Sequence, residues 1–255
     1  MKRCHLAILV AGICMMSVVA VQADWNPGDP YKMHHPQLPD PNGWDVAFTG
    51  NTLADDFQCS ESGEITAVHF WVSWKDDAED WNSITNIHLS FHSDNPQGPE
   101  GWSQPDQLLW EGDFDPGQFV YRTYGDPSPQ GWFDPLTGQY EEDNHNGTWQ
   151  INITGIQNPF YQIKDEIYWL DIEIDQGDNP QGAEIGWKTT TSQDAWNDDS
   201  VYFDEQEPNS WRELIDPVSQ DSLDQAFVVV PEPSVIAMVV AIGGGLVFVR
   251  RIFMI

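Results

Sequence analysis

The sequence contains few basic residues. Lysine and arginine together number 10 among 255 residues, against 41 aspartates and glutamates, and the formal net charge at pH 7 is −31. A surface of this charge repels the phosphate backbone of nucleic acids, so the composition excludes a nucleic-acid partner. Cations and neutral or basic polymers remain electrostatically favourable partners.

Cysteine is also scarce, with only Cys4, Cys14 and Cys59 in the chain. The first two fall within the leader peptide expected below, so the mature protein retains Cys59 alone. A single cysteine forms no internal disulfide, and an exported domain of this composition must be held together by its hydrophobic core. Residues 24–230 are long enough to enclose one sizeable core.

The common catalytic motifs are missing from the sequence. It has no G-x-S-x-G, no H-E-x-x-H and no pattern that pairs Cys59 with a histidine. Any two of its many carboxylates could be chosen as a glycosidase pair, so their presence carries no information. We therefore expect a protein that is not an enzyme, with a secreted polysaccharide hydrolase as an alternative.

Long apolar runs are absent except at the two ends of the chain. At the N-terminus, Lys2 and Arg3 precede an apolar stretch from Leu6 to Val21, and Val21-Gln22-Ala23 has the small residues that signal peptidase requires. This pattern predicts a signal peptide over residues 1–23, cleaved after Ala23, and hence an exported protein. An uncleaved N-terminal membrane anchor is the alternative.

The rest of the chain is rich in aromatic residues. Its 13 tryptophans and 12 phenylalanines can each bury a large apolar area, which favours a folded domain with an acidic surface over a disordered chain. Residues 24–43 hold five prolines and predict an extended lead-in. Residues 44–230 then form the domain.

Short alternating segments separated by turn residues run through this domain. Residues 63–74, 84–92 and 166–175 have the length and the β-branched and aromatic content of strands. In the second, Ile87, Leu89 and Phe91 alternate with His88, Ser90 and His92, and in the third, Tyr168, Leu170, Ile172 and Ile174 alternate with Trp169, Asp171, Glu173 and Asp175. We expect an all-β fold of about ten short strands, an antiparallel β-sandwich of jelly-roll type, with a barrel as the alternative.

The tryptophans suggest a binding function. They are too many for one core of this size to bury comfortably, and exposed aromatic rings on a sandwich stack against sugar rings. A carbohydrate-binding module that holds a polysaccharide through Trp71, Trp102 and Trp132 is therefore one hypothesis. The alternative is that most of the rings lie in the core, which the strong strand patterns around Trp169 and Trp187 favour.

Metal binding is a further hypothesis. Calcium prefers loop carboxylates and carbonyls, and Asp175 and Asp178 lie in the loop with the highest density of such groups. No cofactor is expected otherwise. His88 and His92 are four residues apart on a predicted strand, a separation of about 13 Å, which is too far for both to bind one ion.

The C-terminus resembles a sorting signal. Val235–Val249 is an uncharged segment of about 22 Å as a helix, short for a bilayer core of about 30 Å, and Arg250 and Arg251 follow it. We expect a single transmembrane helix with a cytoplasmic C-terminus, stopped by the arginines. A plain single-pass anchor would explain the span alone.

Pro231, Glu232 and Pro233 stand before this span, and residues 229–251 resemble the PEP-CTERM protein-sorting domain of Gram-negative and related bacteria, so we expect residues 231–255 to be a sorting signal. The resemblance implies processing by an exosortase near Pro-Glu-Pro and transfer to the cell envelope, surface or extracellular matrix. Members of this family are commonly tied to exopolysaccharide and the biofilm matrix. The four apolar residues after the arginines depart from the usual basic ending. The expected role is structural or interactive, with glycan binding and polysaccharide hydrolysis as alternatives.

Overall fold

A computed structural model describes residues 24–99, 101–179, 181–204 and 211–231. It contains fifteen strands and one short 3-10 helix, η1 (Lys75–Asp77). In chain order the strands are β1 (Trp44–Ala47), β2 (Asn51–Gln58), β3 (Gly63–Trp74), β4 (Ile84–Asn95), β5 (Gln104–Phe114), β6 (Phe119–Thr123), β7 (Gln130–Asp134), β8 (Gln139–His145), β9 (Trp149–Thr154), β10 (Tyr161–Gln162), β11 (Ile167–Gln176), β12 (Ile185–Lys188), β13 (Val201–Asp204), β14 (Trp211–Glu213) and β15 (Phe227–Pro231).

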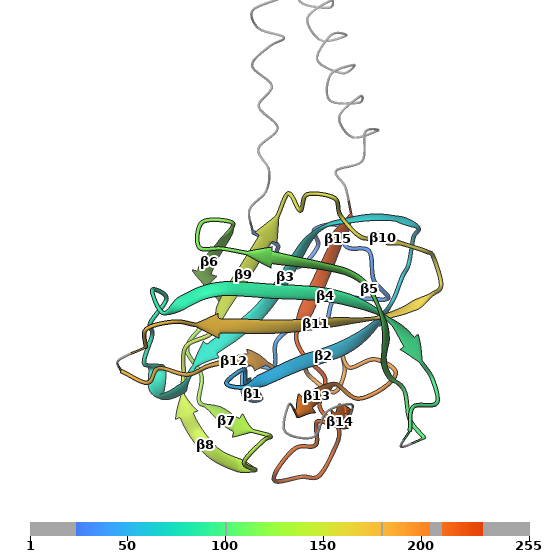
Figure 1. Cartoon of the computed structure of the whole chain (residues 1–255). Helices are drawn as coiled ribbons and strands as arrows, with labels where there is room; N and C mark the ends of the chain where they lie inside the picture. Colours follow the sequence, from blue (N-terminus) through green and yellow to red (C-terminus); the bar gives the residue numbers. More distant parts are fainter. Residues whose placement is uncertain (1–23, 100, 180, 205–210, 232–255) are drawn as a thin grey trace, which may run out of the picture.

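The strands form two sheets (Figure 1). The nine-stranded sheet has the order β6-β9-β3-β12-β1-β7-β8, with β10 and β15 also pairing with β3. The six-stranded sheet has the order β14-β13-β2-β11-β4-β5. Pairing is antiparallel apart from β1 with β7. The expected all-β fold is thus confirmed, and the two sheets are consistent with a β-sandwich.

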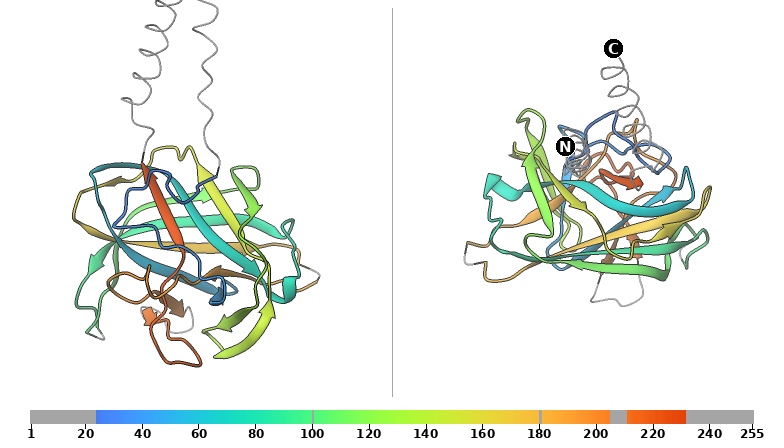
Figure 2. Two further views of the ribbon diagram at one scale, coloured as in Figure 1. Left: turned by 180° about the vertical axis from the view of Figure 1, so that it is seen from behind. Right: turned by 90° about the horizontal axis from the view of Figure 1, so that it is seen from above.

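The core lies between the two sheets, which Figure 2 shows as layers. The predicted alternation of β4 and β11 is confirmed, because Ile87, Leu89 and Phe91 join Leu170 and Ile172 in the buried cluster. Their alternate neighbours lie on the outer face of the six-stranded sheet. Alternating residues of a strand point to opposite sides, so one buried face leaves the other available for polar groups.

The structure has more strands than the ten or so expected. Two strands without a simple alternation show why. Residues 53–57 of β2 include two aspartates and are all buried, whereas β8 is polar and exposed along most of its length. A strand that is covered on both faces has no period-two pattern to recognise. An exposed edge strand has none either, because neither of its faces is apolar.

The tryptophans correct a second expectation. All thirteen are described, and the structure buries eight of them: Trp25, Trp44, Trp71, Trp74, Trp132, Trp149, Trp169 and Trp187. The other five are half-buried. Two packed sheets and the loops that cover their outer faces offer more than one apolar layer. A smaller cluster of Ala54, Trp169 and Val201, covered by Trp102 and Trp211, lies apart from the main core.

The proline-rich lead-in packs against the domain and contributes to its core. The Trp25 indole contacts Trp71 edge-on, with ring centroids 6.2 Å apart, and Met33 is fully buried. The Lys32 amide donates to the Val229 carbonyl at 2.9 Å, so the lead-in lies beside β15. The first and last described residues therefore leave the domain on the same side (Figures 1 and 2).

The predicted signal peptide and the predicted transmembrane span fall on residues 1–23 and 232–255, outside the described residues. Within the described part, no helix is long and apolar enough to cross a membrane. Pro231 is the last residue of β15, so it closes the described domain, whereas Glu232, Pro233, Arg250 and Arg251 lie beyond it, as Ala23 lies before it.

Candidate functional site

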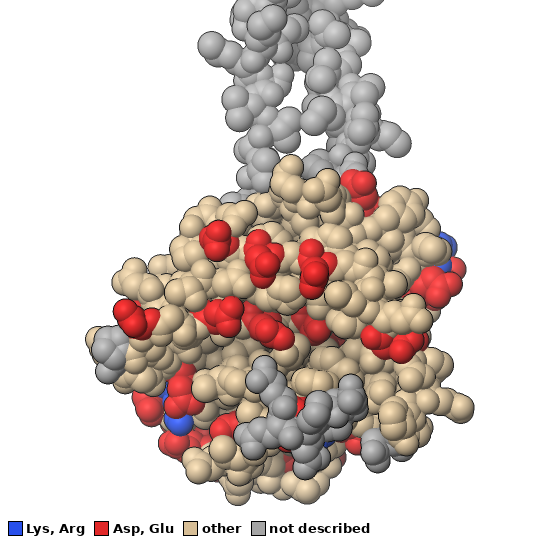
Figure 3. Space-filling view, in the orientation of Figure 1, with Lys and Arg blue, Asp and Glu red and all other residues tan. Residues whose placement is uncertain are grey.

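The outer face of the six-stranded sheet carries two rows of polar side chains. Glu173 on β11, His88 on β4 and Asp113 on β5 are direct cross-strand neighbours. In the next row, Asp171, Ser90 and Glu111 occupy the equivalent positions. We call these two rows, with His92, the acidic face. Figure 3 shows the acidic side chains spread across this side of the molecule, with the visible basic ones near its margin.

The two histidines of the acidic face engage different carboxylates. His88 Nδ1 lies 2.9 Å from Asp113 Oδ1, and its Nε2 lies 3.9 Å from Glu111 Oε2. His92 Nε2 lies 3.3 Å from Asp171 Oδ2. Burial lowers the pKa of each histidine, but the hydrogen bonds to Asp113 and Asp171 and the surrounding negative charge outweigh it, and both pKa values are raised. The raised pKa favours the protonated form of each histidine, whose positive charge offsets part of the negative charge of this face.

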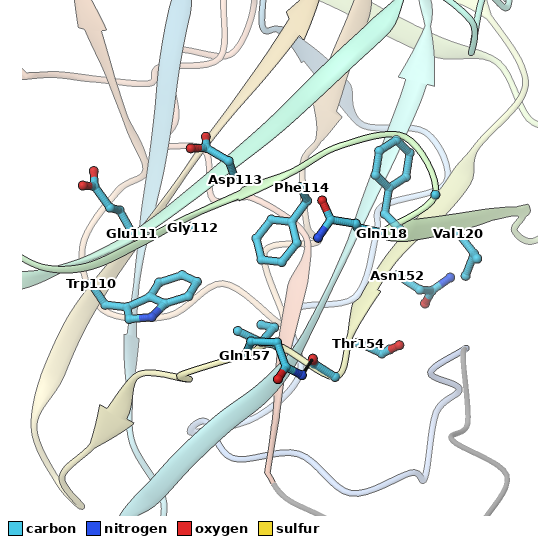
Figure 4. A pocket seen from close by; sticks show the side chains of 14 residues that line it. Trp110, Glu111, Gly112, Asp113, Phe114, Gln118, Val120, Asn152, Thr154 and Gln157 are labelled. Atoms are coloured by element: carbon cyan, nitrogen blue, oxygen red, sulfur yellow. Dashed lines mark hydrogen bonds between the residues drawn. The ribbon is translucent and has the colours of Figure 1, made fainter.

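A groove opens where the edges of the two sheets meet. It lies between β5, the edge strand of the six-stranded sheet, and the strands β6 and β9 of the other sheet, and encloses about 430 Å³. We call it the edge groove. Its lining combines aromatic rings with amides and hydroxyls: Trp110, Phe114, Phe119, Gln118, Asn152, Thr154 and Gln157. Figure 4 shows Trp110 and Phe114 on one side and Asn152 and Thr154 across from them.

Trp110 is held in place from both ends. Its indole Nε1 donates to the Asn158 carbonyl at 2.8 Å, and its ring packs against Phe91 at 5.5 Å between centroids. Gly112 lets the indole lie over the strand, because a Cβ at that position would fall 2.7 Å from Trp110 Cη2. The half-buried ring is thus fixed before any ligand arrives, which reduces the entropy lost on binding.

The acidic face and the edge groove are continuous through β5. Glu111 and Asp113 line the groove and also pair with His88, while their carboxylates project away from the rings of Trp110 and Phe114 (Figure 4). This lining suits a hydroxyl-rich ligand. The aromatic rings can stack against it, the amides can donate and accept hydrogen bonds, and the carboxylates at the rim can accept them. The same carboxylates disfavour an anionic ligand.

The predicted tryptophan platform is wrong for two of its three residues. Trp71 and Trp132 are 0% and 1% exposed, so neither ring can stack against a ligand. Trp102 is half-buried and packs on Trp169 and its neighbours, away from the edge groove. The ring that does line a groove is Trp110, which is not one of the three residues predicted from the sequence. Its position on an edge strand depends on the sheet order, which the sequence does not display.

The predicted calcium ligands are not gathered into a site. Asp175, at the end of β11, and Asp178, in the following loop, are both exposed. Across the described ranges, no three His, Cys, Asp or Glu side chains are grouped as metal ligands. Calcium binding through this loop remains a prediction.

A separate set of carboxyl groups is buried beneath the sheet. Asp55 on β2 accepts from the Gln225 amide at 2.6 Å and from Gln37 Nε2 at 2.9 Å, and Asp224 accepts from the Trp196 amide at 2.8 Å. Burial, together with the neighbouring carboxylates, raises the pKa of Asp55 well above its usual range and that of Asp224 to about 7. These groups favour the protonated state when the domain is folded.

The fold and the groove define a class of protein: an all-β domain of two sheets, with an aromatic and amide groove at its edge and an acidic outer face. The chain belongs to the family defined by the domain of unknown function DUF7901, which matches residues 33–230. The match begins at Met33 and ends at Val230, so it includes part of the lead-in that packs into the core. No curated protein and no solved structure matches the chain.

Proposed function

We propose that this protein is an exported, non-enzymatic component of a bacterial cell envelope or its extracellular matrix, sorted by an exosortase, whose domain binds a neutral or basic polysaccharide at the edge groove. The observation that carries the binding role is the groove itself, where pre-positioned rings face amide side chains. The sorting role is carried by the Pro-Glu-Pro tail of the sequence. The jelly-roll connection of the strands and the C-terminal transmembrane helix belong to the same proposal.

The position of the chain ends supports sorting through the tail. β15 pairs with β3 up to Pro231, and Pro-Glu-Pro starts at that residue. A prolyl segment directly after a strand is held extended, which suits entry into a protease groove at little entropic cost. Because residues 24 and 231 leave the domain on one side (Figure 1), the acidic face and edge groove would be free of the membrane-proximal ends.

Replacing Pro231, Glu232 and Pro233 together by alanine should abolish processing in a bacterium that carries an exosortase. The wild-type protein is expected to lose its tail and leave the inner membrane, whereas the variant should keep its full mass after signal cleavage and remain in the membrane fraction. Mass spectrometry of both fractions measures this. Pro217→Ala, in the loop after β14, is the control and should be processed normally. Normal processing of the triple variant would reject sorting through this motif.

The groove should bind polysaccharide through stacking on Trp110. Trp110→Ala removes the ring but leaves the surrounding amides, so affinity for the retained polysaccharide should fall roughly tenfold or more, equivalent to about 1.4 kcal/mol. Affinity electrophoresis against a panel of neutral, basic and acidic polysaccharides measures it. Tyr140→Ala is the matched control, because this aromatic ring is exposed on β8, at the opposite end of the nine-stranded sheet.

The outcomes of the panel separate the three roles considered. Retention by neutral or basic polysaccharides that depends on Trp110 supports glycan binding. A lack of retention by every polysaccharide would remove that function and leave a structural role in the envelope. Release of soluble sugar during incubation would show hydrolysis and contradict the non-enzymatic proposal.

A further inference from the structure

Three ionisable side chains meet in the interior of the nine-stranded sheet. Asp45 on β1, Lys188 on β12 and His145 on β8 are each 0% exposed. Lys188 Nζ lies 3.0 Å from Asp45 Oδ2, and His145 Nε2 lies 2.9 Å from the same oxygen. Asp45 and Lys188 are direct partners on adjacent antiparallel strands, so their side chains emerge together on one face of the sheet.

This environment is poorly suited to charges. Lysine is almost never fully buried, and the attraction within a buried ion pair often fails to offset the desolvation of both groups. Among the described residues, Asp45 Oδ1 meets no hydrogen-bond donor, which leaves half of the carboxylate without compensation. Burial lowers the pKa of Lys188 despite the neighbouring carboxylate, which moves the amine toward its neutral, nucleophilic form, whereas Lys188 and His145 outweigh burial and lower the pKa of Asp45.

We propose that Lys188 and Asp45 condense to an intramolecular isopeptide bond. The amine, the carboxyl carbon and a proton-transferring imidazole are already within contact distance in a site that excludes water. Water is the product of this condensation, so its exclusion favours the amide over hydrolysis. The amide carries no charge, and the uncompensated oxygen becomes a neutral carbonyl.

The step balances without any co-reactant. One proton passes from the Lys188 ammonium to Asp45 Oδ2, giving a neutral amine and a neutral carboxylic acid. The amine nitrogen attacks Cγ, the bond from Cγ to Oδ2 breaks, and that oxygen leaves as water with a second proton from the nitrogen. His145, hydrogen-bonded to Oδ2, donates the proton that assists departure and recovers one from the nitrogen.

The position of the bond gives it a structural consequence. It joins residues 45 and 188 and so closes a loop that includes most of the domain, with β3, β4, β9 and β11 inside it. A covalent link across so long a loop restricts the unfolded chain strongly. The described domain has one cysteine, Cys59, which is free, so a disulfide does not perform this function.

Peptide mapping of the purified, denatured full chain tests the proposal. Trypsin does not cleave after an acylated lysine, so residues 165–212 should remain in one peptide, linked to the peptide of residues 33–75. The linked species should weigh about 18 Da less than the two peptides together, the mass of one water. Fragmentation should place the bond between Asp45 and Lys188. Recovery of the separate peptides with Lys188 cleaved, or a bond to another acid such as Asp40, would overturn the proposal.

Variants separate the reaction from a simple ion pair. Lys188→Arg keeps the positive charge opposite Asp45 but cannot form the amide, so the water loss should disappear completely. His145→Gln keeps a hydrogen-bonding group near Asp45 yet cannot transfer a proton. Its linked fraction, followed over time after synthesis, should form at least roughly tenfold more slowly. An unchanged rate would remove His145 from the reaction. The wild-type map decides the main point even if a variant fails to fold.

Discussion

Replacing Trp187 by alanine is expected to lower the free energy of unfolding by about 3–5 kcal/mol, the usual cost of removing a buried aromatic side chain. Trp187 is fully buried on β12 and contacts Phe48, Phe70 and Phe227, each with a ring centroid 6.0–6.2 Å away. These residues come from three distant parts of the chain. The indole Nε1 also donates to the Ala226 carbonyl at 2.9 Å, and that buried acceptor would keep the longer bond from the Trp71 amide, at 3.3 Å.

Urea denaturation at constant pH measures this loss, and the melting temperature should fall by roughly 10 °C or more. Trp110→Ala provides the matched comparison, since its half-buried ring lines the edge groove and should cost much less stability. This control also shows whether weaker polysaccharide binding by that variant reflects a folded protein. A loss below about 1 kcal/mol for Trp187→Ala would mean that the core does not depend on this ring as described.

The contribution of Asp224 to the stability of the domain should fall as the pH rises from about 4 to about 7. Burial, the main cause, raises the pKa of Asp224 from its usual 3.8 to about 7, and the pKa of Asp56 is also raised by burial. A carboxyl group with a raised pKa binds more protons in the folded state than in the unfolded state. Its stabilising contribution is therefore complete below pH 3.8 and is lost as the pH passes through the folded value.

The expected size of this effect is large. Each unit of pKa difference between the two states corresponds to about 1.4 kcal/mol, so Asp224 alone accounts for on the order of 4 kcal/mol. Asp224→Asn keeps an oxygen for the Trp196 amide but does not titrate. Relative to the wild type, the variant should gain stability as the pH rises from 4 to 7 and be the more stable protein at pH 8.

Denaturation curves between pH 4 and pH 8, in the presence of a chelator, provide the measurement. Asp178→Asn changes the same type of residue in an exposed loop and should leave the profile parallel to that of the wild type. An unchanged slope in Asp224→Asn would contradict the prediction, because the raised pKa of this group contributes the part of the slope that the variant removes.

The sequence was most informative where one face of a strand is apolar. In β4 and β11, alternating residues predicted the strands, and the structure confirms which side faces the core. The same alternation placed His88 beside polar neighbours. β2 shows the limit of such patterns, because two adjacent aspartates give no local sign of burial, yet Asp55 and Asp56 are both fully buried. No local pattern shows that Gln37 and Gln225, which lie far from Asp55 in the sequence, donate hydrogen bonds to its carboxylate.

By itself, the sequence determined the all-β class, the acidic character and the alternating faces, since these depend on composition and on neighbours within a few residues. The tertiary structure alone decided which tryptophans are covered, that Trp110 lines a groove, and that Asp45 meets Lys188. Those facts depend on strand order and on which sheet covers which face. They are set by contacts between residues far apart in the chain, which no short segment encodes.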